Sequence, residues 1–390
     1  MDDMFLIRQS GPVMSFTYQR LQLLLTKYEL YSMLYSEQER RELSDSSHRD
    51  FYNVRKVDTH IHHSASMNAK YLFRFIKNKL EHHGADIVHV DHLGKSVTLS
   101  EAFTNLGVDV YDISLDKLNV LADKTTLHRF DRFNAKYSPF GEPLLRTIFL
   151  KTDNHMGGRY LGEITRSLLN DLEESKFQHT EWRLSIYGRS KSEWDKLAKW
   201  VLNHNLLSPN NKWMIQIPRL YSEYRKKGEV ENFGQLLENI FKPIIECLMN
   251  PALHPELSVF LKHVSAFDTV DDESKSPLPN DRLFSSRTLT PEKWHLVDNP
   301  SYKYYCFYIH SNLRIVNAIK RLKGQGESQF AFRPHSGEAG EIHHLDTTFL
   351  LADSINHGIN LRRSPVLEYL FYLSQIGIAV SPASNNQLFL

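Results

Sequence analysis

The alternation of short β-rich runs with longer helical runs after residue 183 constrains the fold more than any other feature of the sequence. Such alternation is typical of a parallel sheet whose strands are joined by crossover helices. Strands are predicted at residues 56–63, 183–187, 213–217, 259–261, around 330, around 357 and at 378–381. Helices are predicted between them at residues 68–80, 192–207, 233–249, 302–323, 348–353 and 365–376.

These seven βα-type strands indicate an α/β fold of the (β/α)8 TIM type, in which the eighth strand is absent from this chain. Leucine and aromatic residues at helical spacing over residues 15–35 predict an amphipathic helix. We therefore expect residues 1–53 to form a helical segment packed on a barrel of residues 54–390. Residues 81–112 show no firm period and are interpreted as an insertion on a face of the barrel.

Charge and composition exclude several classes of function. The 47 Lys and Arg residues nearly balance the 46 Asp and Glu residues, which gives no overall field for nucleic acid or an anionic membrane surface. The sequence shows no signal peptide and no apolar run of the roughly 20 residues needed to span a bilayer. With only two cysteines, a disulfide framework is not expected, and the prediction is a cytosolic protein.

Histidines at predicted strand ends indicate a metal site. In the strand over residues 56–63, His60 and His62 project from one face, because successive side chains alternate. His335 follows another strand, where Pro334 ends the β-rich run, and Glu338 lies on a glycine-flanked turn just beyond it. An isolated His-X-His pair is weak evidence among 20 histidines, but its combination with these residues and with His357 is more specific.

The residue types at these strand ends suit metal-assisted hydrolysis. Neutral imidazoles are good zinc ligands, and a bound zinc ion lowers the pKa of its water to about 7. Glu338 would pass protons between water and substrate as a carboxylate that is not itself a ligand. His357 could either orient the hydroxide or accept its proton.

The segment over residues 128–139 mixes basic and aromatic side chains, and two interpretations stay open. It could be a solvated loop with buried rings. Alternatively, its rings could stack on a purine while Arg132 and Lys136 bind an anion.

The motifs over residues 56–62, 114–137, 335–340 and 381–386 resemble the adenosine and AMP deaminase superfamily, with a close match to AMP deaminase. The resemblance implies hydrolytic deamination of AMP at C6 to give IMP and ammonia in purine nucleotide metabolism. It implies one zinc ion per chain bound by His60, His62 and His335. By the same resemblance, Glu338 would donate a proton to the purine ring and His357 would serve as the base.

The resemblance also implies a substrate-binding set and a homotetramer. The residues concerned are His62, Arg132, Phe133, Asn134, Ala135, Lys136, Tyr137 and Glu338.

Two departures from the family pattern affect these expectations. Ser336 stands where the family usually has cysteine, a change that keeps the side chain small. The family also takes a fourth ligand and another catalytic carboxylate from an Asp-Asp pair on the eighth strand, and this chain stops at Leu390 before such a pair. We therefore expect a truncated fragment, whose activity is uncertain.

Two other functions remain as alternatives. One is a catalytically inactive relative that acts as a nucleotide-binding or regulatory subunit. The other is a metal hydrolase of a different substrate, such as a cyclic amidohydrolase.

Overall fold

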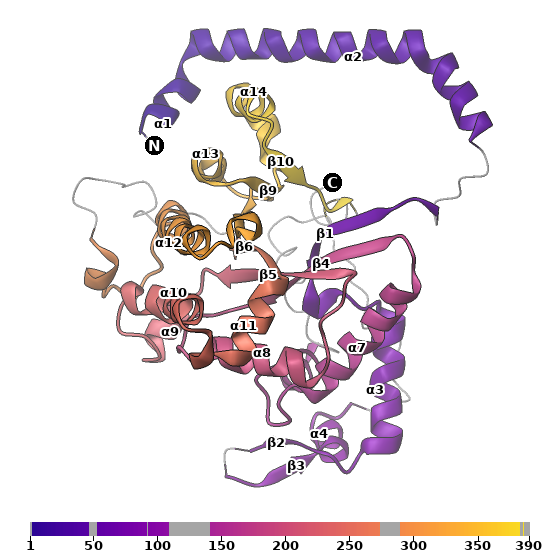
Figure 1. Cartoon of the computed structure of the whole chain (residues 1–390), viewed down its shortest axis with the longest axis vertical. Coiled ribbons are helices and arrows are strands. Elements are labelled where there is room, and N and C mark those ends of the chain that lie inside the picture. The colour runs from indigo at the N-terminus through magenta and orange to yellow at the C-terminus, as the bar shows by residue number, and fades with distance from the viewer. Residues whose placement is uncertain are drawn as a thin grey trace.

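Seven parallel strands, with the interrupted pair β7 and β8 counted as one, organise the computed structural model, which describes residues 2–46, 53–91, 93–108, 141–273, 289–382 and 385 (Figure 1). One sheet has the order β1-β4-β5-β6-β7 and a second the order β8-β9-β10, with every neighbouring pair parallel. The strands are β1 (Lys56–His62), β4 (Gln178–Ser185), β5 (Asn211–Pro218), β6 (Val264–Val270), β7 (Ala331–Phe332), β8 (His335–Ser336), β9 (Ser354–His357) and β10 (Gly377–Ala379).

The two sheets follow directly from one another, since only Arg333 and Pro334 separate β7 from β8. Because the Pro334 nitrogen cannot donate a ladder hydrogen bond, the strand is interrupted there. The predicted α/β class with parallel strands is confirmed. Strands β1 and β10 lie at the outer edges of the two sheets, so the described strands do not close into a barrel.

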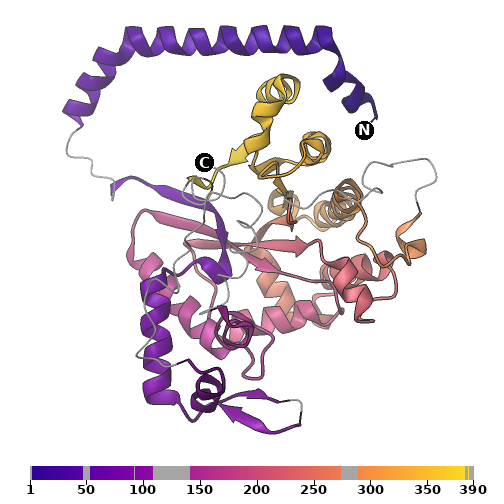
Figure 2. The ribbon, with the colours of Figure 1, turned by 180° about the vertical axis from the view of Figure 1, so that it is seen from behind.

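Helices connect the strands as crossovers and cover the larger sheet from outside (Figures 1 and 2). The helices that occur between the parallel strands along the chain are α3 (Ala69–His83), α6 (Pro143–Leu150), α7 (Arg159–Glu174), α8 (Glu193–Asn203), α9 (Tyr221–Lys226), α10 (Phe233–Met249), α11 (Pro255–Phe260), α12 (Tyr302–Leu322), α13 (His343–Leu351) and α14 (Pro365–Leu373). The helices predicted at residues 233–249 and 302–323 agree with α10 and α12 to within one residue.

The strand predicted at residues 259–261 is wrong. This stretch ends helix α11 and enters a 3-10 turn (Leu261–His263), and the strand β6 begins only at Val264. Pro255 favours a helix start, and Leu257 and Phe260 are buried three residues apart, whereas Val259 between them is 41% exposed. Asp268 therefore lies within the buried strand β6, beyond the predicted strand.

The predicted insertion contains an antiparallel hairpin of β2 (Ile87–Val90) and β3 (Ser96–Thr98), followed by helix α4 (Leu99–Asn105). Thr98 caps α4 in a capping box with Glu101. Figure 1 shows the hairpin at the far end of the molecule from α14.

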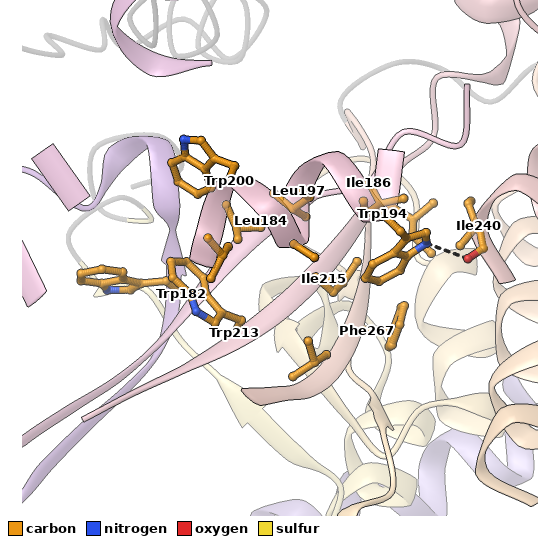
Figure 3. Close-up of a cluster of buried hydrophobic side chains, with 14 of the residues drawn as sticks. Trp182, Leu184, Ile186, Trp194, Leu197, Trp200, Trp213, Ile215, Ile240 and Phe267 are labelled. Atoms are coloured by element: carbon orange, nitrogen blue, oxygen red, sulfur yellow. Dashed lines mark hydrogen bonds between the residues drawn. The ribbon is translucent and has the colours of Figure 1, made fainter. Parts of the chain in front are cut away.

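A continuous apolar layer lies between the larger sheet and its helices (Figure 3). Trp194 of α8 is fully buried in it, and its indole Nε1 donates a hydrogen bond of 2.7 Å to the Ile240 carbonyl of α10. The surrounding side chains are Trp182, Leu184, Ile186, Leu197, Trp200, Trp213, Ile215 and Phe267. Burial of this face turns the alternate residues of the same strands to the opposite face.

The N-terminal region is helical, in α1 (Asp2–Gln9) and α2 (Gly11–Asp45). It meets the body of the molecule at α13 and α14, where Arg8 pairs with Asp346 at 3.2 Å and the Phe16 and Tyr369 rings make an edge contact. Figures 1 and 2 show α2 running past α14 along the outside. Despite the length of α2, no helix of the described residues has the sustained apolar sequence that crossing a membrane requires.

Candidate metal centre

Four histidines from three strands meet at the carboxyl-terminal ends of these strands. His60 and His62 lie at the end of β1, His335 lies where β8 continues the line of β7, and His357 ends β9. One ligand atom from each of His60, His62 and His335 lies within 4.8 Å of the other two. Nε2 of His60 and Nε2 of His335 are 3.1 Å apart. The structure thus brings together the three histidines that the sequence placed at one metal site.

Burial keeps these imidazoles neutral. Burial, followed by the charge of Arg183, lowers the pKa of His62 to about 4 and holds the pKa of His60 and of His335 far below the usual value. A neutral imidazole has a nitrogen lone pair free for a metal, whereas a protonated ring has none.

Partners on other strands orient two of the rings. His62 Nδ1 lies 2.8 Å from Gln216 Oε1 of β5, and His335 Nδ1 lies 3.0 Å from Asp268 Oδ1 of β6. Because both partners are acceptors, each Nδ1 carries the proton and each Nε2 has a free lone pair. Asp268 Oδ1 also accepts the His335 backbone N–H at 2.9 Å, so it fixes both ring and backbone.

A buried arginine also holds the strands that carry the histidines. The side chains of Arg183 and Asp268 are fully buried, with Nη1 and Oδ2 3.1 Å apart. Nη2 of Arg183 donates to the Thr59 carbonyl of β1 at 3.2 Å and to Asn356 Oδ1 of β9 at 2.7 Å. The guanidinium therefore connects β4 to β6, β1 and β9.

The donor set fits a zinc ion. At Zn–N distances of about 2.0–2.1 Å, two ligands of a tetrahedral site are about 3.3 Å apart, which is close to the separation of the His60 and His335 nitrogens. Because the three imidazoles are neutral and already buried, they give up little hydration when they bind a cation. His60 Nδ1 is buried without a hydrogen-bond partner among the described residues.

Glu338 and His357 border the three histidines. Glu338 lies on the turn after β8, with Oε2 3.5 Å from His357 Nε2. Burial, together with the charges of Glu273 and Asp272, raises the pKa of Glu338 to about 8, so the carboxyl is mostly protonated at neutral pH. It can therefore donate a proton there.

His357 is held in one tautomer. Burial lowers its pKa to about 4, so the ring is neutral. Its Nδ1 lies 3.3 Å from the amide nitrogen of Asn385, which can only donate. In this arrangement Nε2 carries the ring proton and points to Glu338.

The remaining predicted site residues form one segment. The segment Arg132, Phe133, Asn134, Ala135, Lys136 and Tyr137 lies outside the described residues, so its role stays a prediction. His63, which sequence analysis did not assign to the site, points away from it into the apolar layer and lies 2.7 Å from the Thr165 hydroxyl.

Sequence reasoning missed the residues that hold the site in place. These are Arg183, Gln216, Asp268, Glu273, Asn356 and Asn385. Several gave a usable signal, because a charged or amide side chain within a strongly apolar parallel strand must face a polar interior. Asp268 was hidden by the misplaced strand start.

The whole chain matches the model of the AMP deaminase family, over residues 1–390. It is 49% identical to AMP deaminase 1 of Mus musculus over 393 residues, which is 100% of this chain and 52% of that protein. It is 48% identical to AMP deaminase 3 of Mus musculus over 97% of this chain and 49% of that protein. Identity to the AMP deaminase of Saccharomyces cerevisiae is 49% over 100% of this chain and 47% of that protein.

The chain spans about half the length of the curated relatives it matches. Among solved structures, an adenine deaminase from Arthrobacter aurescens superposes with a TM-score of 0.41 at 11% identity, covering 85% of this chain and 73% of that chain. That likeness is too low to carry an argument. The match to the family model over every residue and the identity near one half are sufficient: the chain belongs to the AMP deaminase family.

Proposed function

We propose that this chain carries the metal-binding face and the proton donor of a zinc-dependent AMP deaminase, which hydrolyses AMP to IMP and ammonia. The observation that carries the proposal is the meeting of three neutral imidazoles beside a carboxyl group that stays protonated at neutral pH. The names of the relatives support AMP as the substrate.

His60, His62 and His335 would hold the zinc ion through their free Nε2 or Nδ1 atoms. When bound, the ion would supply the Lewis acidity that makes water a nucleophile near neutral pH. Gln216 and Asp268 keep the His62 and His335 rings in the required tautomer.

Glu338 would donate its proton to a ring nitrogen of the adenine while water adds at C6. This transfer neutralises the charge that develops on the ring, and it requires the acid form of the carboxyl. The C6–O bond forms and the bond from C6 to the amino nitrogen breaks. One proton of the water joins the amino group, which leaves as ammonia, and the other returns Glu338 to its acid form.

His357 would orient the attacking water and the Glu338 carboxyl through its Nε2–H group. It could accept a proton at Nε2 only after the Asn385 amide turned its oxygen towards Nδ1, because the ring would then carry its proton on Nδ1. Asn385 therefore controls whether His357 acts as a donor or as the base that the family resemblance implies.

The further features of this proposal come from the family resemblance. The seven parallel strands would belong to a TIM-type barrel with residues 1–53 as an appendage and residues 54–390 as its barrel domain. His62, Glu338 and residues 132–137 would bind the substrate. A cytosolic homotetramer active in purine nucleotide metabolism is part of the same proposal.

Ammonia release from AMP tests the proposal. The zinc-loaded chain is expected to convert AMP to IMP with one ammonia per IMP, and to act on adenosine far more slowly. Zinc binding without any ammonia release would favour the nucleotide-binding alternative. Faster hydrolysis of a cyclic amide than of AMP would favour the other rival and would contradict the proposal.

A further inference from the structure

Glu273, three residues beyond β6, has a buried carboxylate that binds the turn carrying Glu338. Its oxygens accept the backbone N–H groups of Gly337 at 3.0 Å, Glu338 at 2.6 Å and Ala339 at 3.0 Å. A fourth donor, His344 Nδ1, lies 2.9 Å away. Only 4% of Glu273 is exposed, so these contacts replace the water that a carboxylate would otherwise bind.

The shape of the turn depends on the same residue. Gly337 and Gly340 have φ of +73° and +65°, a region that favours glycine. A Cβ atom at Gly340 would overlap the Glu273 backbone carbonyl. The turn is therefore held against Glu273 by the carboxylate and by direct backbone packing.

His344 extends this contact to the metal-binding end of the turn. Its ring stacks on Tyr302 of α12 with centroids 3.8 Å apart, and the Tyr302 hydroxyl donates to the His335 carbonyl at 2.6 Å. The turn is thus anchored both at His335 and at residues 337–339.

Glu273 carries its negative charge in this environment. Burial raises its pKa, but hydrogen bonds from His344 and from the backbone N–H groups outweigh burial and hold the pKa below the usual value. Burial first, and then this charge and that of Asp272, raise the pKa of Glu338 to about 8, while the nearby His357 is neutral. A carboxyl group next to two negative charges is harder to ionise.

We propose that Glu273 is a positioning residue, whose buried carboxylate holds residues 337–339 and places a negative charge beside Glu338. This inference rests on the proposed function of Glu338 as the proton donor. It assigns to Glu273 a purpose beyond folding, because an uncharged acceptor of similar shape would retain part of the contact but not the charge.

The titration of the Glu338 carboxyl tests the inference without requiring turnover. The protein is labelled with 13C at the glutamate carboxyls, and the Glu338 signal is assigned by its loss in Glu338→Gln. In Glu273→Gln we expect the pKa of Glu338 to fall by about one unit, because burial still raises it, whereas Glu273→Asp, which keeps the charge, should leave it higher than in Glu273→Gln. Glu238→Gln, on the exposed face of α10, is the control for an equal change in net charge.

Amide hydrogen exchange provides a second measurement on the same variants. Glutamine offers one neutral acceptor oxygen in place of two charged ones, so the hydrogen bonds weaken and exchange at residues 337–339 should accelerate by about tenfold or more. An unchanged pKa of Glu338 in Glu273→Gln, or exchange as slow as in the unmodified chain, would overturn the inference.

Activity separates this inference from the proposed function. If Glu338→Gln turned over AMP normally, the proton-donor role of Glu338 would be wrong whatever Glu273 does. If Glu338→Gln were inactive while Glu273→Gln kept the same kcat and the same alkaline limit of activity, only the role of Glu273 would fail. We expect Glu273→Gln to keep its zinc and to lose kcat first at high pH.

Discussion

The two faces of strands β4, β5 and β6 differ more than any other neighbouring parts of the molecule. Their outer face presents Trp182, Trp213 and Phe267 to the covering helices, and this layer is apolar and closed to water (Figure 3). Their inner face presents Arg183 and Asp268, which are equally buried but charged.

The two faces of this sheet therefore contribute differently to the free energy of folding. Apolar burial on the outer face stabilises the fold by about 25 cal/mol for each Å² removed from water. A buried ion pair on the inner face seldom stabilises a fold relative to apolar residues of the same size, because both charges lose their hydration. We infer that the inner charges are maintained for the position of the histidines above them.

The largest expected effect is on catalysis at the inner face. Replacing Glu338 by Gln keeps the shape but removes the ionisable proton, so kcat should fall by about 10²–10⁴-fold. Zinc content and the unfolding midpoint should change little, because Glu338 is not among the clustered metal-binding atoms. Steady-state kinetics together with metal analysis would check this, and near-normal kcat would contradict it.

A substitution on the outer face should have the opposite profile. Trp194→Ala opens a cavity in the apolar layer and removes the hydrogen bond to Ile240, so the free energy of unfolding should fall by about 3–5 kcal/mol. Urea titration measures this change. The folded fraction should still bind zinc normally, and Phe307→Ala at a half-exposed position is the control.

A smaller effect is expected where the two roles meet. Asp268→Asn keeps the size of the side chain but removes the charge that Arg183 and His335 share, and changes to such supporting residues cost about 10–100-fold in metal affinity. Competition with a zinc chelator measures this affinity. Asp153→Asn, which breaks an exposed ion pair with Arg189, should have no effect, and equal losses in both variants would argue against a specific role for Asp268.

The smallest effect concerns pH. The acid form of Glu338 is present below its raised pKa of about 8 and disappears as the pH rises through that value. At constant zinc occupancy, kcat should therefore be level near neutrality and should decline above about pH 8, by up to tenfold for each further pH unit. A rate that continued to increase to pH 10 would exclude Glu338 as the proton donor.

Most strands and helices could be predicted because their apolar side chains recur at the spacing that places them on one buried face of the element. The spacing of His60 and His62 on one strand, and the break at Pro334 before His335, were visible in the sequence for the same local reason. These features need only short-range geometry.

The supporting residues could not be predicted because they depend on strand order and register. Gln216 reaches His62 only because β5 follows β4 beside β1, and Arg183 reaches Asn356 across the interior between the two sheets. Glu273 approaches residues 337–339 from 64 to 66 positions away along the chain. No local pattern in the sequence specifies such distant pairs.

Zinc analysis of the purified chain and two histidine variants tests most directly whether His60, His62 and His335 form one metal site. We predict about one zinc per chain, lost in His335→Ala and retained in His82→Ala, whose histidine is exposed on α3. Equal zinc contents in the two variants would contradict the claim.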